Sequence, residues 1–361
     1  MKSKNYADKK NSASKGSRVW IAAIVLINAA WIILAALARS LPNFAPFYTN
    51  TVYQLLQGCI SRFSNLFPFS LSEVLLYALP TFFVISLIVK IARRKSAAPL
   101  LKSAAIVVSV LLLLYQTNCG INYYNTSFAE TEGFGRVNDK EVLIEFCEFT
   151  AEKLHESSDA AESAIIYPAG SELAAEAVRA MEKLGTNYSS LEGYYPRPKG
   201  LIIPRPFSNM GVTGIYSPFT IEANYNSEMT AYNLPFTACH ELSHLRGFMN
   251  ESEANFVGFL ACINSDNPAF QRSGYMMAWV YAGNQLYKVD RNEFNRLRAS
   301  LPESVKKELE ENNQFWDTYE TKASEVQDAV NDEYLKQHGI SDGIQNYSRV
   351  VELMLGWFAT S

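Results

Sequence analysis

The stretch FTACHELSHLRGFMNESEANF, residues 236–256, contains two of the four histidines in the chain. His240 and His244 are four residues apart, and Glu241 directly follows the first of them. On an α-helix, side chains at this spacing lie on one face, so both imidazoles can direct a nitrogen to the same point. Imidazole is a common ligand of Zn²⁺, which keeps a position open for water at catalytic sites. This HExxH pattern predicts a site for one zinc ion, with Glu241 as the general base that acts on the zinc-bound water.

A third protein ligand is expected shortly after the histidine pair. Asn250, a poor zinc ligand, stands where a short third-histidine pattern would place a histidine, and Gly247 favours the end of the first helix. A second helix, ESEANFVGFLACI, is then expected to return alongside. Glu251 shares a face of this helix with Asn255, which can orient a ligand by a hydrogen bond, whereas Glu253 is rotated by about 200° from Glu251. Glu251 is the preferred ligand and Glu253 the alternative.

Three apolar segments in the first third of the chain are long enough to cross a membrane. The first, residues 19–38, carries no charge and matches roughly 30 Å of hydrocarbon. It is too long for a signal-peptide core and lacks a convincing cleavage site, so we expect a retained anchor. The others are expected at about 70–92, where a membrane helix tolerates Pro80, and at about 99–117. Residues 19–117 are therefore predicted to be a three-helix transmembrane region in the lipid bilayer, and amphipathic spacing in residues 52–67 suggests a helix on the membrane surface.

The distribution of charge predicts how the chain is oriented. Residues 1–118 hold 13 Lys or Arg and two acids, which leaves 19 of the 32 basic and 34 of the 36 acidic residues for the remainder. The basic residues concentrate in the tail 1–18 and in the link between the second and third apolar segments, so the positive-inside rule places both in the cytoplasm. Residues 118–361 then form an extracytoplasmic domain, whose acidity argues against a nucleic-acid partner.

The extracytoplasmic domain is predicted to be mainly helical, with a small β element, and thus α+β. Apolar residues recur at helical spacing in residues 140–156, in 171–185 and from 234 onward. Between them, GVTGIYSPFTIEANYN (residues 211–226) has the composition of two short strands or one bent strand. An edge strand beside a cleft can pair with a peptide backbone, with Glu222 and Asn224 lining that cleft. The alternative is an ordinary structural hairpin. The five irregularly spaced cysteines favour buried thiols over a disulfide framework.

Further short motifs give the chain a resemblance to a known bacterial family. They are PFSLSE at 68–73, Asn-Tyr-Tyr at 122–124, GIYSPFTIEANYN at 214–226 and NYSRVV at 346–351. With HELSH and ESEANF, they resemble domain-of-unknown-function family 3810, which is grouped with the glutamate-liganded zinc peptidases, or gluzincins. The resemblance covers nearly the whole chain and departs at Ser348, where glycine is expected. It implies a zincin-like fold, zinc bound by a Glu three residues before an Ala-Asn pair, and a bacterial cytoplasmic membrane, but no particular substrate.

We therefore expect an enzyme, a membrane-anchored zinc metallopeptidase that hydrolyses peptides or proteins outside the cytoplasm. Tyr347 and Arg349 are candidates to stabilise an oxyanion, with structural hydrogen bonds as the simpler interpretation of both. The alternative function is a non-hydrolytic zinc-binding sensor or assembly factor that retains a peptidase fold. Glu241 favours the enzyme, because a purely structural zinc site needs no base at that position.

Overall fold

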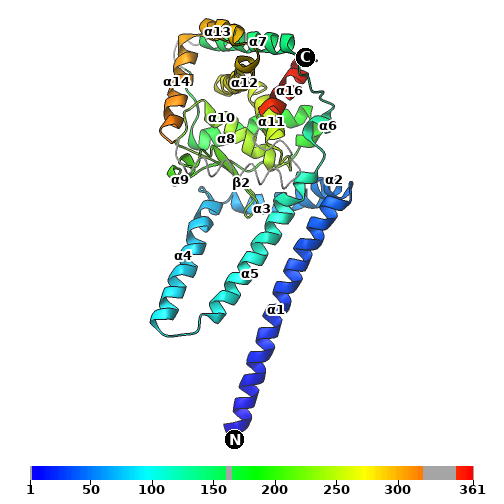
Figure 1. Cartoon of the computed structure of the whole chain (residues 1–361), viewed down its shortest axis with the longest axis vertical. Helices are drawn as coiled ribbons and strands as arrows, with labels where there is room; N and C mark the ends of the chain where they lie inside the picture. Colours follow the sequence, from blue (N-terminus) through cyan, green and yellow to red (C-terminus); the bar gives the residue numbers. More distant parts are fainter. Residues whose placement is uncertain (1, 160–164, 320–346, 361) are drawn as a thin grey trace.

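Three long helices project to one side of a helical domain in the computed structural model, which describes residues 2–159, 165–319 and 347–360 (Figure 1). They are α1 (Lys2–Ser40), α4 (Leu71–Ala92) and α5 (Ala98–Tyr115). The segments Val19–Ser40, Leu71–Ala92 and Ala98–Tyr124 are long and apolar enough to cross a membrane. The prediction of three such helices is confirmed, and α4 continues through Pro80. These helices are consistent with a membrane protein.

The segment between α1 and α4 lies across the base of the domain (Figure 1). It contains α2 (Phe44–Tyr48), the helical turn η1 (Thr49–Tyr53) and α3 (Gln54–Ser64). The polar residues Gln57, Ser61 and Ser64 of α3 are buried against the domain, whereas Leu55 on the same helix is 72% exposed. The predicted helix therefore forms, and these polar side chains pack on protein together with the partly buried Leu56 and Ile60.

The domain is built mainly from helices around α10. Its helices and turns are η2 (Gln116–Gly120), η3 (Asn122–Tyr124), α6 (Phe128–Glu132), α7 (Lys140–Asp159), α8 (Gly170–Asn187), η4 (Ser189–Leu191), α9 (Arg205–Ser208), α10 (Asn233–His244), α11 (Glu251–Ile263), α12 (Pro268–Val289), α13 (Arg291–Ser300), α14 (Glu303–Asp317) and α16 (Tyr347–Phe358). Helix α10 packs against α8, α11 and α12 on its helical side and against a small sheet on another. Nearly all residues of α10 are buried, so its polar side chains lie inside the domain.

The sheet has three short strands, β1 (Lys199–Gly200), β2 (Gly214–Ser217) and β3 (Glu222–Tyr225). Their order is β1-β3-β2, with β1 parallel and β2 antiparallel to β3. The predicted β element is thus a hairpin of two strands with β2 at one edge. This hairpin packs directly against α10.

Two buried carboxylates join α4 to the sheet side of the domain. Glu222 of β3 accepts hydrogen bonds from the first backbone N–H groups of α4, at Leu71 (3.1 Å) and Ser72 (2.8 Å), and forms a buried ion pair with Lys199. In return, Glu73 of α4 accepts hydrogen bonds from the backbone N–H groups of residues 202 (2.6 Å) and 203 (2.7 Å). The domain predicted to begin at residue 118 therefore also depends on contacts from the segment before it.

Candidate metal centre

The histidine pair lies on the inner face of α10, and the chain then turns sharply into α11. Gly247 has φ +96°, a left-handed conformation that favours glycine, and it follows the end of α10 as expected. The side chain of Asn250 accepts a hydrogen bond from the backbone N–H of Ser252 (2.9 Å) and so caps α11. Helix α11 begins at Glu251, as predicted, and packs along α10. The turn therefore places the first residue of α11 beside the histidines.

Three side chains converge at this point: His240, His244 and Glu251. Their potential ligand atoms all lie within 4.8 Å of one another. The two Nε2 atoms are 3.2 Å apart, and Glu251 carboxylate oxygens lie 3.3 Å from His240 Nε2 and 3.8 Å from His244 Nε2. Tetrahedral zinc with bonds of about 2.0–2.1 Å requires ligand atoms roughly 3.3 Å apart. The spacing and chemistry of these three groups fit a single zinc ion.

The surroundings of His244 and Glu251 favour their metal-binding protonation states. The Nδ1 atom of His244 lies 2.7 Å from the carbonyl oxygen of Phe248, which accepts a hydrogen bond from it. In the neutral ring the proton is then on Nδ1, and the unprotonated Nε2 is free to bind a metal ion beside Glu251. Burial lowers the pKa of His244 to about 4, so this imidazole is neutral. Burial opposes ionisation of Glu251, but the two imidazoles outweigh it and lower the pKa of that carboxyl to about 2. For His240, burial lowers the pKa, whereas Glu251, Glu241 and Asn255 raise it more.

Glu241 lies beside the three converging side chains but is not one of them. Its Oε1 atom is 4.0 Å from His240 Nε2. Burial raises the pKa of the Glu241 carboxyl to about 8, with His240 and the backbone N–H of Tyr216 acting against this increase. Among the described residues, no hydrogen-bond partner reaches Glu241 Oε2 or His240 Nδ1, although both are buried. A buried carboxyl that is not fully hydrogen-bonded, next to a ligand group, can exchange a proton with a molecule bound there.

Strand β2 approaches Glu241 closely at a position that requires glycine. A Cβ atom at Gly214 would lie 2.5 Å from Glu241 Oε1 and 2.8 Å from the Cγ2 of Thr237. The absence of a side chain at residue 214 therefore lets the edge strand and the carboxylate come together.

If Glu241 is the general base that the HExxH pattern predicts, Gly214→Ala should reduce the turnover by about 100-fold, because displacing a catalytic group by about 1 Å can have an effect of this size. Zinc content should stay unchanged, since Glu241 is not among the converging ligands. The measurement is kcat together with bound zinc per chain. Gly135→Ala is the matched control, because a Cβ there would meet nothing within 4 Å. Equal loss in both variants, or loss of zinc from Gly214→Ala, would contradict this account.

Several residues predicted for the site have other contacts. The alternative ligand Glu253 is turned away from the histidines, and its Oε2 accepts a hydrogen bond from the backbone N–H of Ala129 (2.9 Å) in the first turn of α6. The prediction that Glu222 and Asn224 line a cleft is not what the structure shows. Glu222 holds the start of α4, and Asn224 is buried and donates to Ser72 Oγ (3.3 Å) and to a carbonyl of β2. Glu222 and Asn224 are two residues apart in β3, so they lie on the same face of the strand, and this face packs against the start of α4.

Of the remaining predicted residues, only Asn255 lies near the histidines. Asn255 is close enough to His240 to influence the pKa of its imidazole, which agrees with a supporting role. Arg349 is in α16, which packs on α7, α11 and α12, and it is not part of the converging group. Tyr347 begins α16, but its side chain lies outside the described residues, as does Asn346 of the NYSRVV motif.

A tyrosine that the sequence did not single out lies next to the metal group. The ring of Tyr216 in β2 is 6.3 Å from the ring of His244. Its hydroxyl donates to the carbonyl of Asn118 (2.8 Å), at the end of the third apolar segment, and lies 3.0 Å from the hydroxyl of Tyr53. Tyr53 in turn donates to the carbonyl of Leu245 (3.1 Å). The one signal in the sequence that could have indicated Tyr216 as a neighbour of the metal group is its place in the hairpin, two residues after Gly214.

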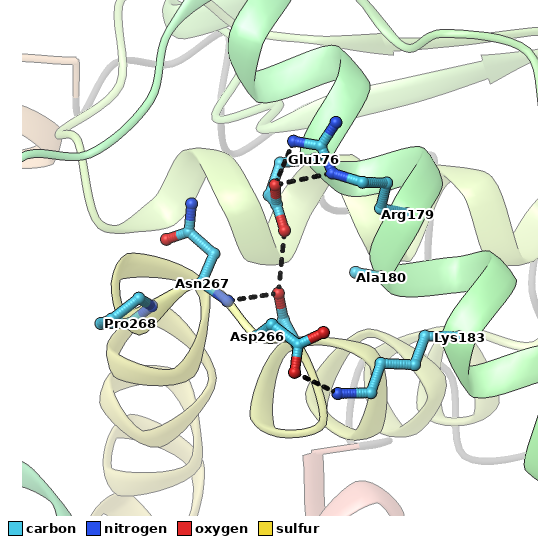
Figure 2. A pocket seen from close by; sticks show the side chains of 8 residues that line it. Glu176, Arg179, Ala180, Lys183, Asp266, Asn267 and Pro268 are labelled. Atoms are coloured by element: carbon cyan, nitrogen blue, oxygen red, sulfur yellow. Dashed lines mark hydrogen bonds and ion pairs between the residues drawn. The ribbon is translucent and has the colours of Figure 1, made fainter.

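A surface hollow of about 330 Å³ between α8 and the start of α12 contains no residue of the metal group. Figure 2 shows its lining, in which Arg179 pairs with Glu176, and Lys183 pairs with Asp266. Glu176 also accepts a hydrogen bond from Ser265 (3.2 Å). The charged groups of this hollow are thus paired with one another, and the converging group at α10 and α11 is the stronger candidate site.

Comparison with known proteins gives one family. A family model described as "Protein of unknown function (DUF3810)" matches residues 48–355. No curated protein and no solved structure matches the chain. The matched region includes the segment before α4, the second and third membrane-length helices, the sheet and the whole converging group. The chain therefore belongs to the DUF3810 family of proteins of unknown function.

Proposed function

We propose that this protein is a membrane-anchored zinc metallopeptidase with a zincin-like domain of the gluzincin type outside the cytoplasm. The observation that carries the proposal is the convergence of His240, His244 and Glu251 within 4.8 Å, with the buried carboxyl of Glu241 alongside. The orientation rests on the basic residues of the N-terminal tail and of the link between α4 and α5, which favour the cytoplasm.

In this proposal His240, His244 and Glu251 hold the zinc. When bound, zinc would polarise the substrate carbonyl and lower the pKa of a water molecule at the site. Positive charge near Glu241 also favours its ionised form over the neutral form that burial favours. Glu241 then takes a proton from the attacking water and gives it to the nitrogen of the leaving amine. One carboxyl group thus serves first as base and then as acid.

Strand β2 supplies a place for the substrate backbone. Within the described residues it is an edge strand, paired only with β3, and Gly214 brings it against Glu241. A peptide added along such an edge gains main-chain hydrogen bonds without requiring particular side chains. This arrangement favours hydrolysis of extended peptide segments over a site that only stores or senses zinc.

The test uses the full-length protein, purified in detergent. Bound zinc is measured by elemental analysis, and cleavage of randomised peptides, free and attached to a membrane helix, is followed by mass spectrometry. We expect about one zinc per chain and cleavage that stops on chelation and returns with added zinc. A protein without zinc affinity would refute the metal site. Zinc binding with no cleavage of either peptide form would support a sensor or assembly factor instead.

A further inference from the structure

The base of the domain carries an exposed apolar surface that the proposed function does not use. It comprises Leu55, Phe63 and Leu66 from α3 and the residues after it, Ile202 and Ile203 from the loop after β1, and Phe219 from the β2–β3 turn. Each of these side chains is between 41% and 76% exposed. We call this set the apolar base. Its three segments are far apart in the sequence, so the surface is created by folding.

All three segments are fixed at the level where the membrane-length helices meet the domain. Glu73, in the first turn of α4, binds the backbone N–H groups of Ile202 and Ile203. Asn118, at the end of the third apolar segment, donates through Nδ2 to the carbonyl of Pro218 (2.8 Å), next to Phe219. Helix α3 lies between the domain and the membrane-length helices (Figure 1). The apolar base therefore continues the apolar surface of those helices.

The lipid bilayer is the occupant that this geometry favours. Helix α3 buries Gln57, Ser61 and Ser64 in the domain together with the partly buried Leu56 and Ile60, and it presents Leu55 and Phe63 to the exterior, beside Arg62. An amphipathic helix in a membrane interface places its apolar side in the boundary between headgroups and acyl chains. Because Ile202, Ile203 and Phe219 are held to the ends of α4 and α5, the same layer would receive them.

The metal group lies a short distance above this surface. Strand β2 approaches Glu241 at Gly214 and ends at Ser217, next to Pro218, so its length of about 10 Å is the most that can separate the two levels along it. Tyr216 gives a second link, since its ring lies 6.3 Å from that of His244 while its hydroxyl binds the carbonyl of Asn118. The buried contacts of Glu73 and Glu222 with the domain and α4 oppose any lifting of the domain from the membrane helices.

We propose that the substrates are chains anchored in the same bilayer, cut in the extended segment within a few residues of the membrane surface. The inference rests on the proposed peptidase function and names its substrate class. A segment that leaves the bilayer beside the apolar base needs only about three residues, at about 3.3 Å each, to reach the level of Glu241. A site far from the membrane would impose no such limit.

The experiment presents one randomised ten-residue segment to the full-length protein in liposomes in three membrane-attached forms. Each form has a single membrane helix, followed by a spacer of three residues, of twelve prolines or of twelve alternating Gly and Ser. Twelve prolines form a stiff rod of about 37 Å, whereas the Gly-Ser spacer is flexible and can fold back. We expect the three-residue and Gly-Ser forms to be cut at least tenfold faster than the proline form. Equal cleavage of all three would overturn the inference and leave the peptidase function intact.

A second measurement tests the apolar base without relying on activity. Spin labels are attached at Leu55→Cys, Leu66→Cys and Ile203→Cys in a Cys59→Ser background, with Val289→Cys at the end of α12 as the control. Val289 is 50% exposed and next to α13, which lies at the far end of the domain (Figure 1). Labels on the base should be relaxed more by lipid-soluble oxygen than by a water-soluble nickel complex, and the control label should show the reverse.

The two measurements separate the possible failures. Lipid-exposed labels with no cleavage of any form would refute the peptidase and this substrate class together, while keeping the apolar base as a membrane contact. Base labels in water would overturn the inference even if free peptides are cut. Lipid-exposed labels with spacer-dependent cleavage would support both proposals.

Discussion

Glu241→Gln should reduce peptide hydrolysis by a factor on the order of 10²–10⁴, which is the usual contribution of general acid–base catalysis. The amide has nearly the shape of the carboxyl group but cannot take a proton from water or deliver one to the leaving amine. Zinc content should remain at the wild-type value, because Glu241 is not one of the three converging ligands. The measurements are kcat with a cleaved peptide and zinc per chain by elemental analysis.

The stability of this variant gives an internal check on the prediction. Burial raises the pKa of Glu241 to about 8, so in the metal-free protein at neutral pH its carboxyl is mainly neutral, and a neutral amide replaces it at little cost. The midpoint of thermal unfolding without zinc should therefore stay close to that of wild type. Glu192→Gln, an exposed position, is the matched control for activity. Wild-type turnover in Glu241→Gln would exclude Glu241 as the base.

Glu251→Gln should weaken zinc binding by more than about 100-fold, whereas Glu253→Gln should leave it nearly unchanged. Loss of an outer partner of a metal ligand already lowers affinity by about 10–100-fold, and loss of a charged ligand should exceed that. Glu251 lies 3.3 Å from His240, whereas Glu253 binds the backbone of Ala129. Zinc affinity is measured by competition with a chromophoric chelator.

The two variants control for each other, because each removes one carboxylate from the first turn of the same helix. Glu253→Gln retains a carbonyl oxygen for the N–H of Ala129, so the fold should persist. The reverse result, with zinc lost only from Glu253→Gln, would mean that Glu253 is the ligand. Equal, small effects in both variants would mean that neither carboxylate binds the metal.

Local signals in the sequence predicted the elements around the metal group. Gly247 ends a helix for reasons within one turn of the chain, so the end of α10 followed from it, whereas the cap that Asn250 gives to α11 came only from the structure. The choice between Glu251 and Glu253 followed from helical rotation, and the structure places Glu251 with the histidines. The three membrane-length segments followed from composition alone, because each is apolar along nearly its whole length, whereas the extension of α1 back to Lys2 did not.

The contacts of residues whose partners are far away in the chain could not be predicted from the sequence. Glu222 looked like a cleft residue because a polar side chain in a short strand gives no indication of what covers it. Its partners, Lys199 and the first turn of α4, are set by the tertiary fold. Tyr216 was missed for the same reason, since its hydroxyl reaches Asn118, 98 positions away. The burial of Gln57, Ser61 and Ser64 in α3 was also not predictable, because it depends on the domain that covers them.

The contacts of α3 have a consequence for the order in which the protein is made. Lys199 donates to the carbonyl of Ser64 (2.7 Å) across a sequence separation of 135 residues, and Gln57 donates to the carbonyl of Tyr194 (3.1 Å) across 137. A ribosome therefore completes all three membrane-length helices before it makes these partners. Until then the polar side chains of α3 lack their partners in the domain, so they offer the growing chain a surface on which the later domain can assemble. The domain, which is synthesised later, thus supplies the hydrogen-bond partners of α3, a helix that is synthesised early.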